Sequence, residues 1–119
     1  MAVEEGDTLS EFRSFRERMN DRILGAGNLE IKRFFALDDR VYREGALPVK
    51  TKELLGLVSS TVLRCDDCIR YHVLRCKEEG VTDEEVFETL SVALVVGGSI
   101  TIPHLRRAVD FMDELNAVS

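Results

Sequence analysis

The sequence predicts an all-α protein, a helical bundle of five to six helices that assembles into an oligomer. Apolar residues recur every three or four positions along most of the chain, which is typical of amphipathic helices. Glycines and capping residues separate these segments at short intervals, and no alternating pattern indicates a strand or a hairpin. The length of 119 residues is that of one domain, so we expect residues 1–119 to form a single domain.

The N-terminal third of the chain contains two predicted helices. Residues 8–24 form the first, because five apolar residues spaced by three or four make one stripe: Leu9, Phe12, Phe15, Met19 and Ile23. The glycine-rich segment 25–27 ends this helix. Asn28 can cap the second helix, which Gly45 and Pro48 terminate.

The third and fifth predicted helices are unusually apolar. Residues 50–63 form the third, which has no charged residue from position 54 onward, and we expect it to be buried on most faces. The capping pattern Thr82-Asp83-Glu84-Glu85 opens the fifth, which ends in the apolar run 92–96. A monomer of this size has difficulty enclosing both helices, so we expect part of their surface to be buried between subunits.

Two further helices complete the bundle. The fourth begins near Asp66 or Asp67, whose charges suit a helix N-terminus, and Gly80 ends it after about residue 79. The sixth spans about residues 101–116, which places Pro103 in its first turn, where proline is tolerated.

Composition excludes several classes of function. The formal net charge is −6 without a basic cluster, which argues against nucleic-acid and anionic-membrane partners. The longest apolar run, residues 92–96, is too short to span a bilayer, and the first residues lack the pattern of a signal peptide. We therefore expect a cytoplasmic protein, in which three cysteines are catalytic, metal-binding or buried rather than structural disulfides.

The fourth helix carries the chemistry. Cys68 and His72 are four residues apart and therefore neighbours on one face, while Cys65 either continues that face or caps the helix. A helix N-terminus favours thiolate, and an imidazole one turn along can accept the proton of Cys68. The spacing to His72 favours Cys68 as the attacking thiolate, whereas the helix end favours Cys65. We choose Cys68, with Cys65 as the resolving thiol.

Two other residues have competing interpretations. Cys76 lies about 12 Å along the helix from Cys68, too far for a disulfide, so we expect a small buried hydrophobe. Glu53 lies with Gly56 and Ser60 on a strip of small residues along the third helix, where we expect a neighbouring helix to come close. It could orient or deprotonate His72 if the third and fourth helices pack antiparallel. Sequence physics alone favours the alternative, an exposed first-turn glutamate stabilised by the helix dipole.

The four candidate residues have a fixed spacing: eleven residues separate Glu53 from Cys65, two separate Cys65 from Cys68, and three separate Cys68 from His72. This pattern resembles the active-site signature of the AhpD-like alkylhydroperoxidases. These belong to the carboxymuconolactone decarboxylase superfamily. The segments Lys50-Thr51-Lys52-Glu53-Leu54-Leu55 and Cys65-Asp66-Asp67-Cys68-Ile69-Arg70-Tyr71-His72 are similar to that family, and the likeness extends over about residues 28–115.

The resemblance implies an all-α homo-oligomer, commonly a trimer or hexamer, that acts as a peroxidase or thiol–disulfide oxidoreductase in antioxidant defence. Cys65 and Cys68 would be the redox pair, His72 the base near Cys68, and Glu53 the carboxylate of the proton relay. The substrate would be a peroxide or a disulfide. No cofactor is implied beyond the cysteine pair and an external dithiol donor.

The sequence departs from the family pattern at one position. The best-known alkylhydroperoxidase of the family has a histidine immediately before the second cysteine, where this chain has Asp67. An acid there disfavours the thiolate and removes one relay member, which bears on peroxidase turnover more than on dithiol chemistry. The decarboxylase branch generally lacks the cysteine pair. The presence of this pair here therefore argues against lactone decarboxylation.

Three alternatives stay open. A carboxymuconolactone decarboxylase-like enzyme is the first, and a non-catalytic oligomeric helical binding module with an incidental cysteine pair is the second. A zinc site is the third, although structural zinc usually draws ligand pairs from two segments and no second pair exists. We interpret His104 and the arginines beside it as an ordinary helix start with solvated charges, outside the site.

Overall fold

The computed structural model describes residues 7–118, and every regular element in this range is helical. The α-helices are α1 (Asp7–Gly25), α2 (Leu29–Val41), α3 (Val49–Val62), α4 (Asp66–Glu78), α5 (Asp83–Gly97) and α6 (Ile102–Val118), with a 3₁₀ turn, η1 (Ser99–Thr101), before α6. The predicted all-α class is confirmed, and the described helices other than α2 begin and end within two residues of their predicted bounds. α2 begins after its predicted cap Asn28 and ends at Val41, before the predicted breakers Gly45 and Pro48.

The helix ends follow the capping signals of the sequence. The Asn28 side chain accepts a hydrogen bond from the Ile31 N–H at 3.0 Å. Thr82 and Glu85 form the predicted reciprocal pair, in which each side chain accepts from the other's backbone N–H, at 3.1 and 2.9 Å. Gly27 and Gly80 adopt positive φ angles of 79° and 81°, which glycine reaches without steric cost. These local signals therefore determine where the helices stop and turn.

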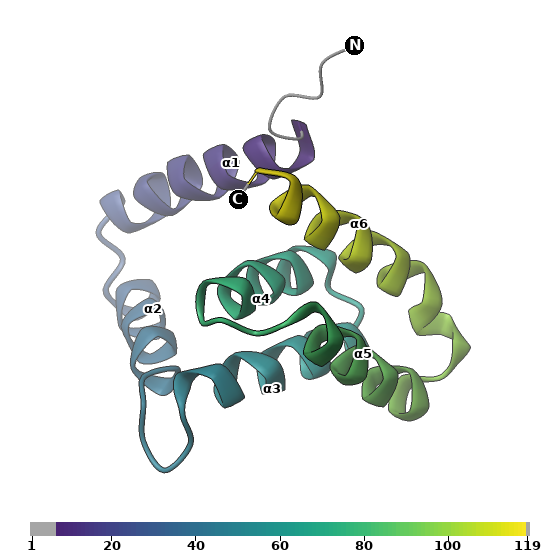
Figure 1. Cartoon of the computed structure of the whole chain (residues 1–119). Coiled ribbons are helices and arrows are strands. Elements are labelled where there is room, and N and C mark those ends of the chain that lie inside the picture. Colours follow the sequence, from purple (N-terminus) through teal and green to yellow (C-terminus); the bar gives the residue numbers. More distant parts are fainter. Residues whose placement is uncertain (1–6, 119) are drawn as a thin grey trace.

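The helices are arranged around α4, which lies in the middle of the molecule (Figure 1). α3 packs against α4 and α5, and α4 packs against α6. The first part of α1 contacts the C-terminal part of α6. Leu57 of α3, Ile69 and Val73 of α4, and Phe111 of α6 are at most 1% exposed and lie in the same apolar core. The core thus holds α4 from several sides and fixes the helix that carries the cysteines.

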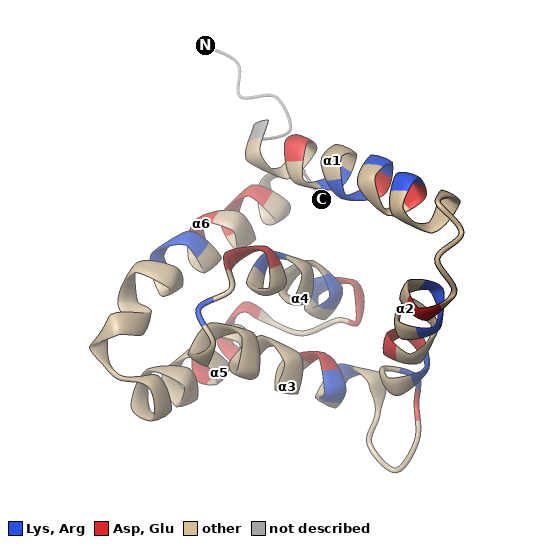
Figure 2. Ribbon diagram, turned by 180° about the vertical axis from the view of Figure 1, so that it is seen from behind, with Lys and Arg blue, Asp and Glu red and all other residues tan. Residues whose placement is uncertain are grey.

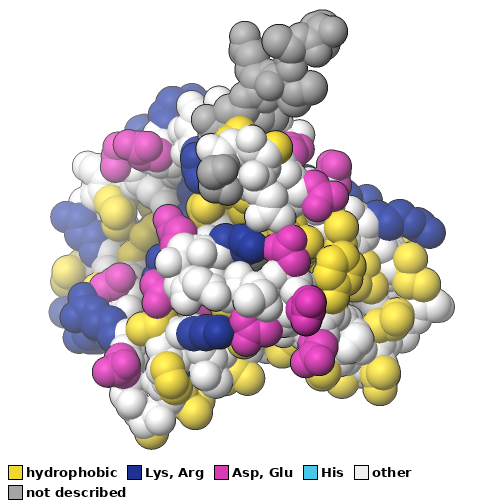
Figure 3. Space-filling model, in the orientation of Figure 1, with side chains coloured by type: hydrophobic (Ala, Val, Ile, Leu, Met, Phe, Trp, Pro, Cys, Tyr) yellow, Lys and Arg dark blue, Asp and Glu magenta, His cyan; other side chains and the backbone are white. Residues whose placement is uncertain are grey.

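The single chain leaves much apolar surface uncovered. α2 has no buried residue, and the end of α5 is exposed, with Val95 at 85%. Leu63 next to α3 is 77% exposed and Leu55 is also exposed, so the expectation that this helix is enclosed on most faces is wrong for the single chain. Figure 3 shows apolar side chains at the surface on several parts of the face that it presents.

Charged residues are absent from a long stretch of the surface. The sequence has no Asp, Glu, Lys or Arg between positions 89 and 105, which covers the second half of α5 and the start of α6. This region is uniformly tan in Figure 2, unlike α1 and α2, where both signs of charge alternate. No helix in the described part of the chain is long and apolar enough to cross a membrane.

Candidate active site

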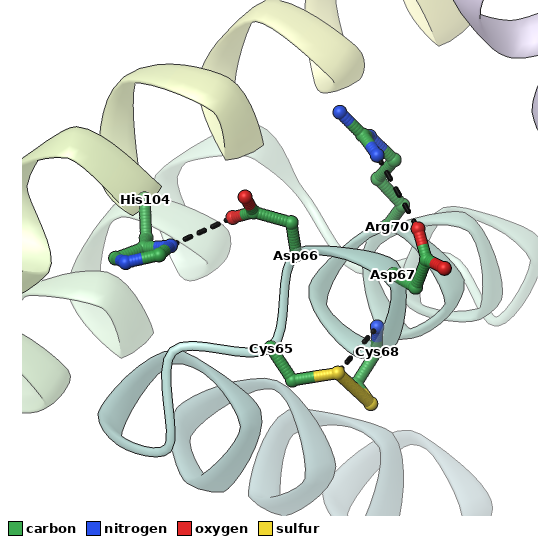
Figure 4. Close-up of a disulfide and its surroundings, with 6 residues drawn as sticks. All are labelled: Cys65, Asp66, Asp67, Cys68, Arg70 and His104. Carbon is green, nitrogen blue, oxygen red and sulfur yellow. Dashed lines mark hydrogen bonds and ion pairs between the residues drawn. A yellow bond between two sulfur atoms is a disulfide. The ribbon is translucent and has the colours of Figure 1, made fainter.

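The two cysteines of the Cys65–Cys68 pair lie at the start of α4 and are joined by a disulfide, with a Cα–Cα distance of 5.3 Å (Figure 4). Cys65 is the N-cap of α4, and its sulfur accepts from the Cys68 N–H at 3.3 Å. The sequence allowed Cys65 either to continue the face of the helix or to cap it, and in the structure Cys65 caps it. Cys68 sits in the first turn and is exposed.

A tight turn places Cys65 there. Arg64 adopts a φ of 61°, an uncommon left-handed conformation for a residue other than glycine. The Arg64 N–H donates to the Thr61 carbonyl and the Cys65 N–H to the Ser60 carbonyl, at 3.0 and 3.1 Å, which closes the end of α3. The chain then reverses, so that α4 runs back along α3 (Figure 1).

His72 lies one turn after Cys68 and shares a hollow with it. The hollow has a volume of about 260 Å³, and its lining comes from α1, α2 and α4: Arg16, Asp38, Asp67, Cys68, Tyr71 and His72. The predicted pair of thiol and imidazole thus borders one space that a small reactant can enter.

Glu53 is buried against His72. Its side chain is 1% exposed, and Oε1 lies 2.9 Å from His72 Nδ1. The interpretation of Glu53 as an exposed first-turn residue is therefore wrong. Because a carboxylate can only accept a hydrogen bond, His72 Nδ1 donates this hydrogen bond to Glu53. Nε2 is left as the ring nitrogen that can take a proton.

Arg75, which is partly exposed, is a third member of this group. Its Nε lies 3.6 Å from Glu53 Oε2, so the carboxylate faces His72 with one oxygen and a guanidinium with the other. A buried carboxylate is costly unless it is paired in this way. Sequence reasoning missed Arg75, although its place three residues after His72 puts both on one face of α4.

Two tyrosines enclose the imidazole. The rings of Tyr42 and Tyr71 have their centroids 5.4 and 5.2 Å from that of His72. Burial, and then the negative charge of Glu53, raise the pKa of Tyr42. Tyr71 precedes His72 in the sequence, whereas nothing in the sequence signals that Tyr42, at the end of α2, reaches the site.

The small-residue strip of α3 has a specific role at Gly56. A Cβ atom at this position would lie 2.5 Å from His72 Cε1 and 2.7 Å from both ring nitrogens. The imidazole therefore rests directly on the backbone of α3. This confirms the expectation that a neighbour approaches α3 closely along this strip.

The third cysteine has a different environment. Cys76 is fully buried in the core and is not bonded to another cysteine. Burial, and then the charge of Glu53, raise the pKa of its thiol to about 12. The expectation of a small buried hydrophobe is confirmed, and this thiol is inert at neutral pH.

The two aspartates between the cysteines have different partners. Asp67 is exposed and lies 3.4 Å from Arg70 Nη1. Asp66 contacts His104 Nδ1 at 2.7 Å and Arg107 Nε at 2.9 Å, both from α6. The sequence suggested ordinary solvated residues of a helix start. Arg107 is indeed exposed, at 48%, but it is paired with Asp66, and His104 is both paired and largely buried, at 15%. Within residues 7–118, no three His, Cys, Asp or Glu side chains are grouped closely enough to hold a metal ion.

The fold is that of a known family. Residues 31–111 match the carboxymuconolactone decarboxylase family, and the chain belongs to it. A crystal structure from Thermotoga maritima has 63% sequence identity and a TM-score of 0.86, and the match covers 90% of this chain and 91% of that one. That protein is described as a carboxymuconolactone decarboxylase family member with a suggested involvement in an antioxidative response.

Two curated relatives are more distant. "Uncharacterized protein 4 in cox locus" of Paracoccus denitrificans is 32% identical over 83 residues, which are 70% of this chain and 75% of the relative. Alkyl hydroperoxide reductase AhpD of Corynebacterium kroppenstedtii is 39% identical over 46 residues, which are 39% of this chain and 26% of that protein. The predicted AhpD-like family membership is confirmed.

The contact between Gly56 and His72 is testable. In Gly56→Ala the new methyl group must displace the imidazole and weaken its hydrogen bond to Glu53, so we expect unfolding free energy to fall by about 1–3 kcal/mol, as for overpacked cores. Chemical denaturation checks this. Gly25→Ala is the control, because a Cβ there meets nothing within 4 Å. Equal effects of the two substitutions would contradict the close packing.

Proposed function

We propose that this protein is a dithiol oxidoreductase that reduces peroxides or disulfides in antioxidant defence, with Cys65 and Cys68 alternating between disulfide and dithiol. The observation that carries the proposal is the buried hydrogen bond between Glu53 and His72, one helical turn from Cys68 and beside the same hollow. A histidine with no role in chemistry needs neither a buried carboxylate partner nor access to a reactive sulfur.

The dithiol form is activated by proton transfer. Only the thiolate is nucleophilic, and an ordinary cysteine is a few per cent ionised at neutral pH. His72 accepts the proton of Cys68 through Nε2 while Nδ1 stays hydrogen-bonded to Glu53. The carboxylate holds the imidazole in this orientation and stabilises its charged form. The N–H groups at the start of α4 stabilise the thiolate in turn.

With a peroxide, the Cys68 thiolate attacks the terminal oxygen and the O–O bond breaks. Cys68 becomes a sulfenic acid, and the alcohol leaves with a proton from the histidine. The Cys65 thiol then attacks the Cys68 sulfur, forming the disulfide and releasing water. The peroxide gains two electrons, and the cysteine pair loses two.

With a disulfide substrate, the same thiolate attacks one sulfur and forms a mixed disulfide, which Cys65 resolves by expelling the second thiol. In both cases an external dithiol reduces the Cys65–Cys68 bond and is itself oxidised to a disulfide. Such donors are found in reducing compartments, which favours a cytoplasmic location.

A substrate panel tests this proposal. We expect turnover of peroxides or of small disulfides with a dithiol donor, loss of turnover in Cys65→Ser and Cys68→Ser, and full turnover in Cys76→Ser, whose thiol lies in the core. The alternative, a carboxymuconolactone decarboxylase-like activity, is supported by the family and would appear as lactone decarboxylation that survives loss of both cysteines. No turnover of any substrate, with both thiols unreactive, would favour the oligomeric binding module.

The roles of His72 and Glu53 make a separate prediction. In a Cys65→Ser and Cys76→Ser background, His72→Gln should slow iodoacetamide labelling of Cys68 at pH 7 by about 10- to 1,000-fold, because general-base help is lost. Glu53→Gln should slow it less, because the base survives. The measurement is the labelling rate against pH. An unchanged rate and pH midpoint in His72→Gln would make His72 a purely structural residue.

The exposed apolar surface leads us to propose a homo-oligomer, a trimer or hexamer by family resemblance. The uncharged stretch between residues 89 and 105 and the exposed side chains of α2 form more apolar surface than a soluble monomer usually presents. We expect sedimentation at micromolar concentration to give a multiple of 13.5 kDa. A monomer under these conditions would contradict the proposal. No nucleic-acid or membrane partner is part of it.

A further inference from the structure

We propose that His104 and Arg107 of α6 are positioning residues for the redox pair, which act by neutralising Asp66 beside Cys65 and thereby set the balance between disulfide and dithiol. The proposal rests on the dithiol function proposed above. It concerns residues outside the pattern of Glu53, Cys65, Cys68 and His72, on a helix that contributes nothing else to the site.

The contacts of Asp66 are the basis. Oδ1 lies 2.7 Å from His104 Nδ1 and Oδ2 lies 2.9 Å from Arg107 Nε, so each carboxylate oxygen has its own cationic or N–H partner. These partners are 38 and 41 residues away in the sequence and come from a different helix (Figure 4 shows the contact with His104). A carboxylate accepts hydrogen bonds only, so His104 Nδ1 carries a proton here.

Asp66 is thereby kept ionised and compensated. Partial burial opposes ionisation, but the hydrogen bond from His104 and the charge of Arg107 outweigh it and lower the pKa of Asp66. Its side chain is 30% exposed and that of His104 15%, so solvent screens this group less than it screens Asp67, at 80%. Solvent therefore screens the charges of the two neighbouring aspartates unequally.

The sign of the effect on the redox pair follows from charge. Reduction of the disulfide by two electrons and two protons gives two thiols, and part of the product ionises at neutral pH. A nearby carboxylate disfavours the thiolate and so favours the disulfide, whereas stabilised thiolate favours the dithiol. By compensating Asp66, Arg107 and His104 shift the equilibrium toward the dithiol.

Two substitutions should therefore act in opposite directions. Arg107→Gln leaves the carboxylate less compensated and should shift the equilibrium with glutathione about 2- to 5-fold toward the disulfide, which is about 9–21 mV for two electrons. Asp66→Asn removes the carboxylate but keeps both partners, and should shift the equilibrium by a similar factor toward the dithiol. A merely structural contact would give both variants the same direction.

The chain offers matched controls. Arg106 is the exposed neighbour of Arg107 and lies on a different face of α6, so Arg106→Gln should leave the equilibrium within the error of the wild type. Asp67→Asn removes the same charge from a more exposed position and should shift the equilibrium less than Asp66→Asn. Arg107→Lys keeps the charge and should restore most of the wild-type value.

The experiment measures the fractions of disulfide and dithiol in the full-length protein across glutathione redox buffers at pH 7, at low and high salt. Opposite shifts that shrink at high salt support the proposal. Shifts in one direction, or equal effects of Arg107→Gln and Arg106→Gln, overturn it. No peroxide or other substrate is involved, so an inactive protein with opposite shifts would refute only the proposed function. An active protein without them would refute only this inference.

Discussion

The buried carboxylate of Glu53 is the constraint on which the site depends. A carboxylate at 1% exposure is tolerated only with charged or hydrogen-bonding partners, and both of its partners, His72 and Arg75, come from α4. This requirement fixes the register of α3 against α4. Gly56 makes the register possible, because the imidazole rests on its backbone. Once His72 is fixed, Cys68 is fixed one turn earlier in the same rigid helix.

The turn between α3 and α4 follows from that register. Only three residues separate the two helices, and Arg64 takes up a left-handed conformation to let the chain reverse. Such a conformation persists where the surrounding structure over-determines it. Here the buried Glu53–His72 contact and the hydrogen bond from Cys65 N–H to the Ser60 carbonyl hold the two sides of the turn. Cys65 is left as the cap of α4, within bonding distance of Cys68.

Local signals in the sequence are sufficient to predict the helices and to predict that the thiols and the imidazole lie close together on α4. Asn28 and Thr82 cap helices because their side chains reach backbone N–H groups three residues away, and such contacts need no tertiary structure. Glu53 shows the limit: sequence physics favoured an exposed residue, and only the family resemblance placed it in the site. The position of Tyr42 beside His72 and the pairing of Asp66 with α6 depend on how helices distant in the sequence pack together. No local sequence pattern predicts such packing.

The three cysteines show how position within one short segment separates two kinds of thiol. Cys76 lies in the core, where burial raises its pKa to about 12 and leaves it inert. Cys65 and Cys68 lie at the helix N-terminus, where the backbone favours an anion while the two adjacent aspartates oppose it. In the function we propose, their reactivity is a balance of charges that partners from other helices adjust: Glu53 of α3, which pairs with His72, and His104 and Arg107 of α6, which pair with Asp66. A cysteine pair on an isolated helix would lack these partners, so the proposed chemistry depends on the surrounding bundle as well as on α4.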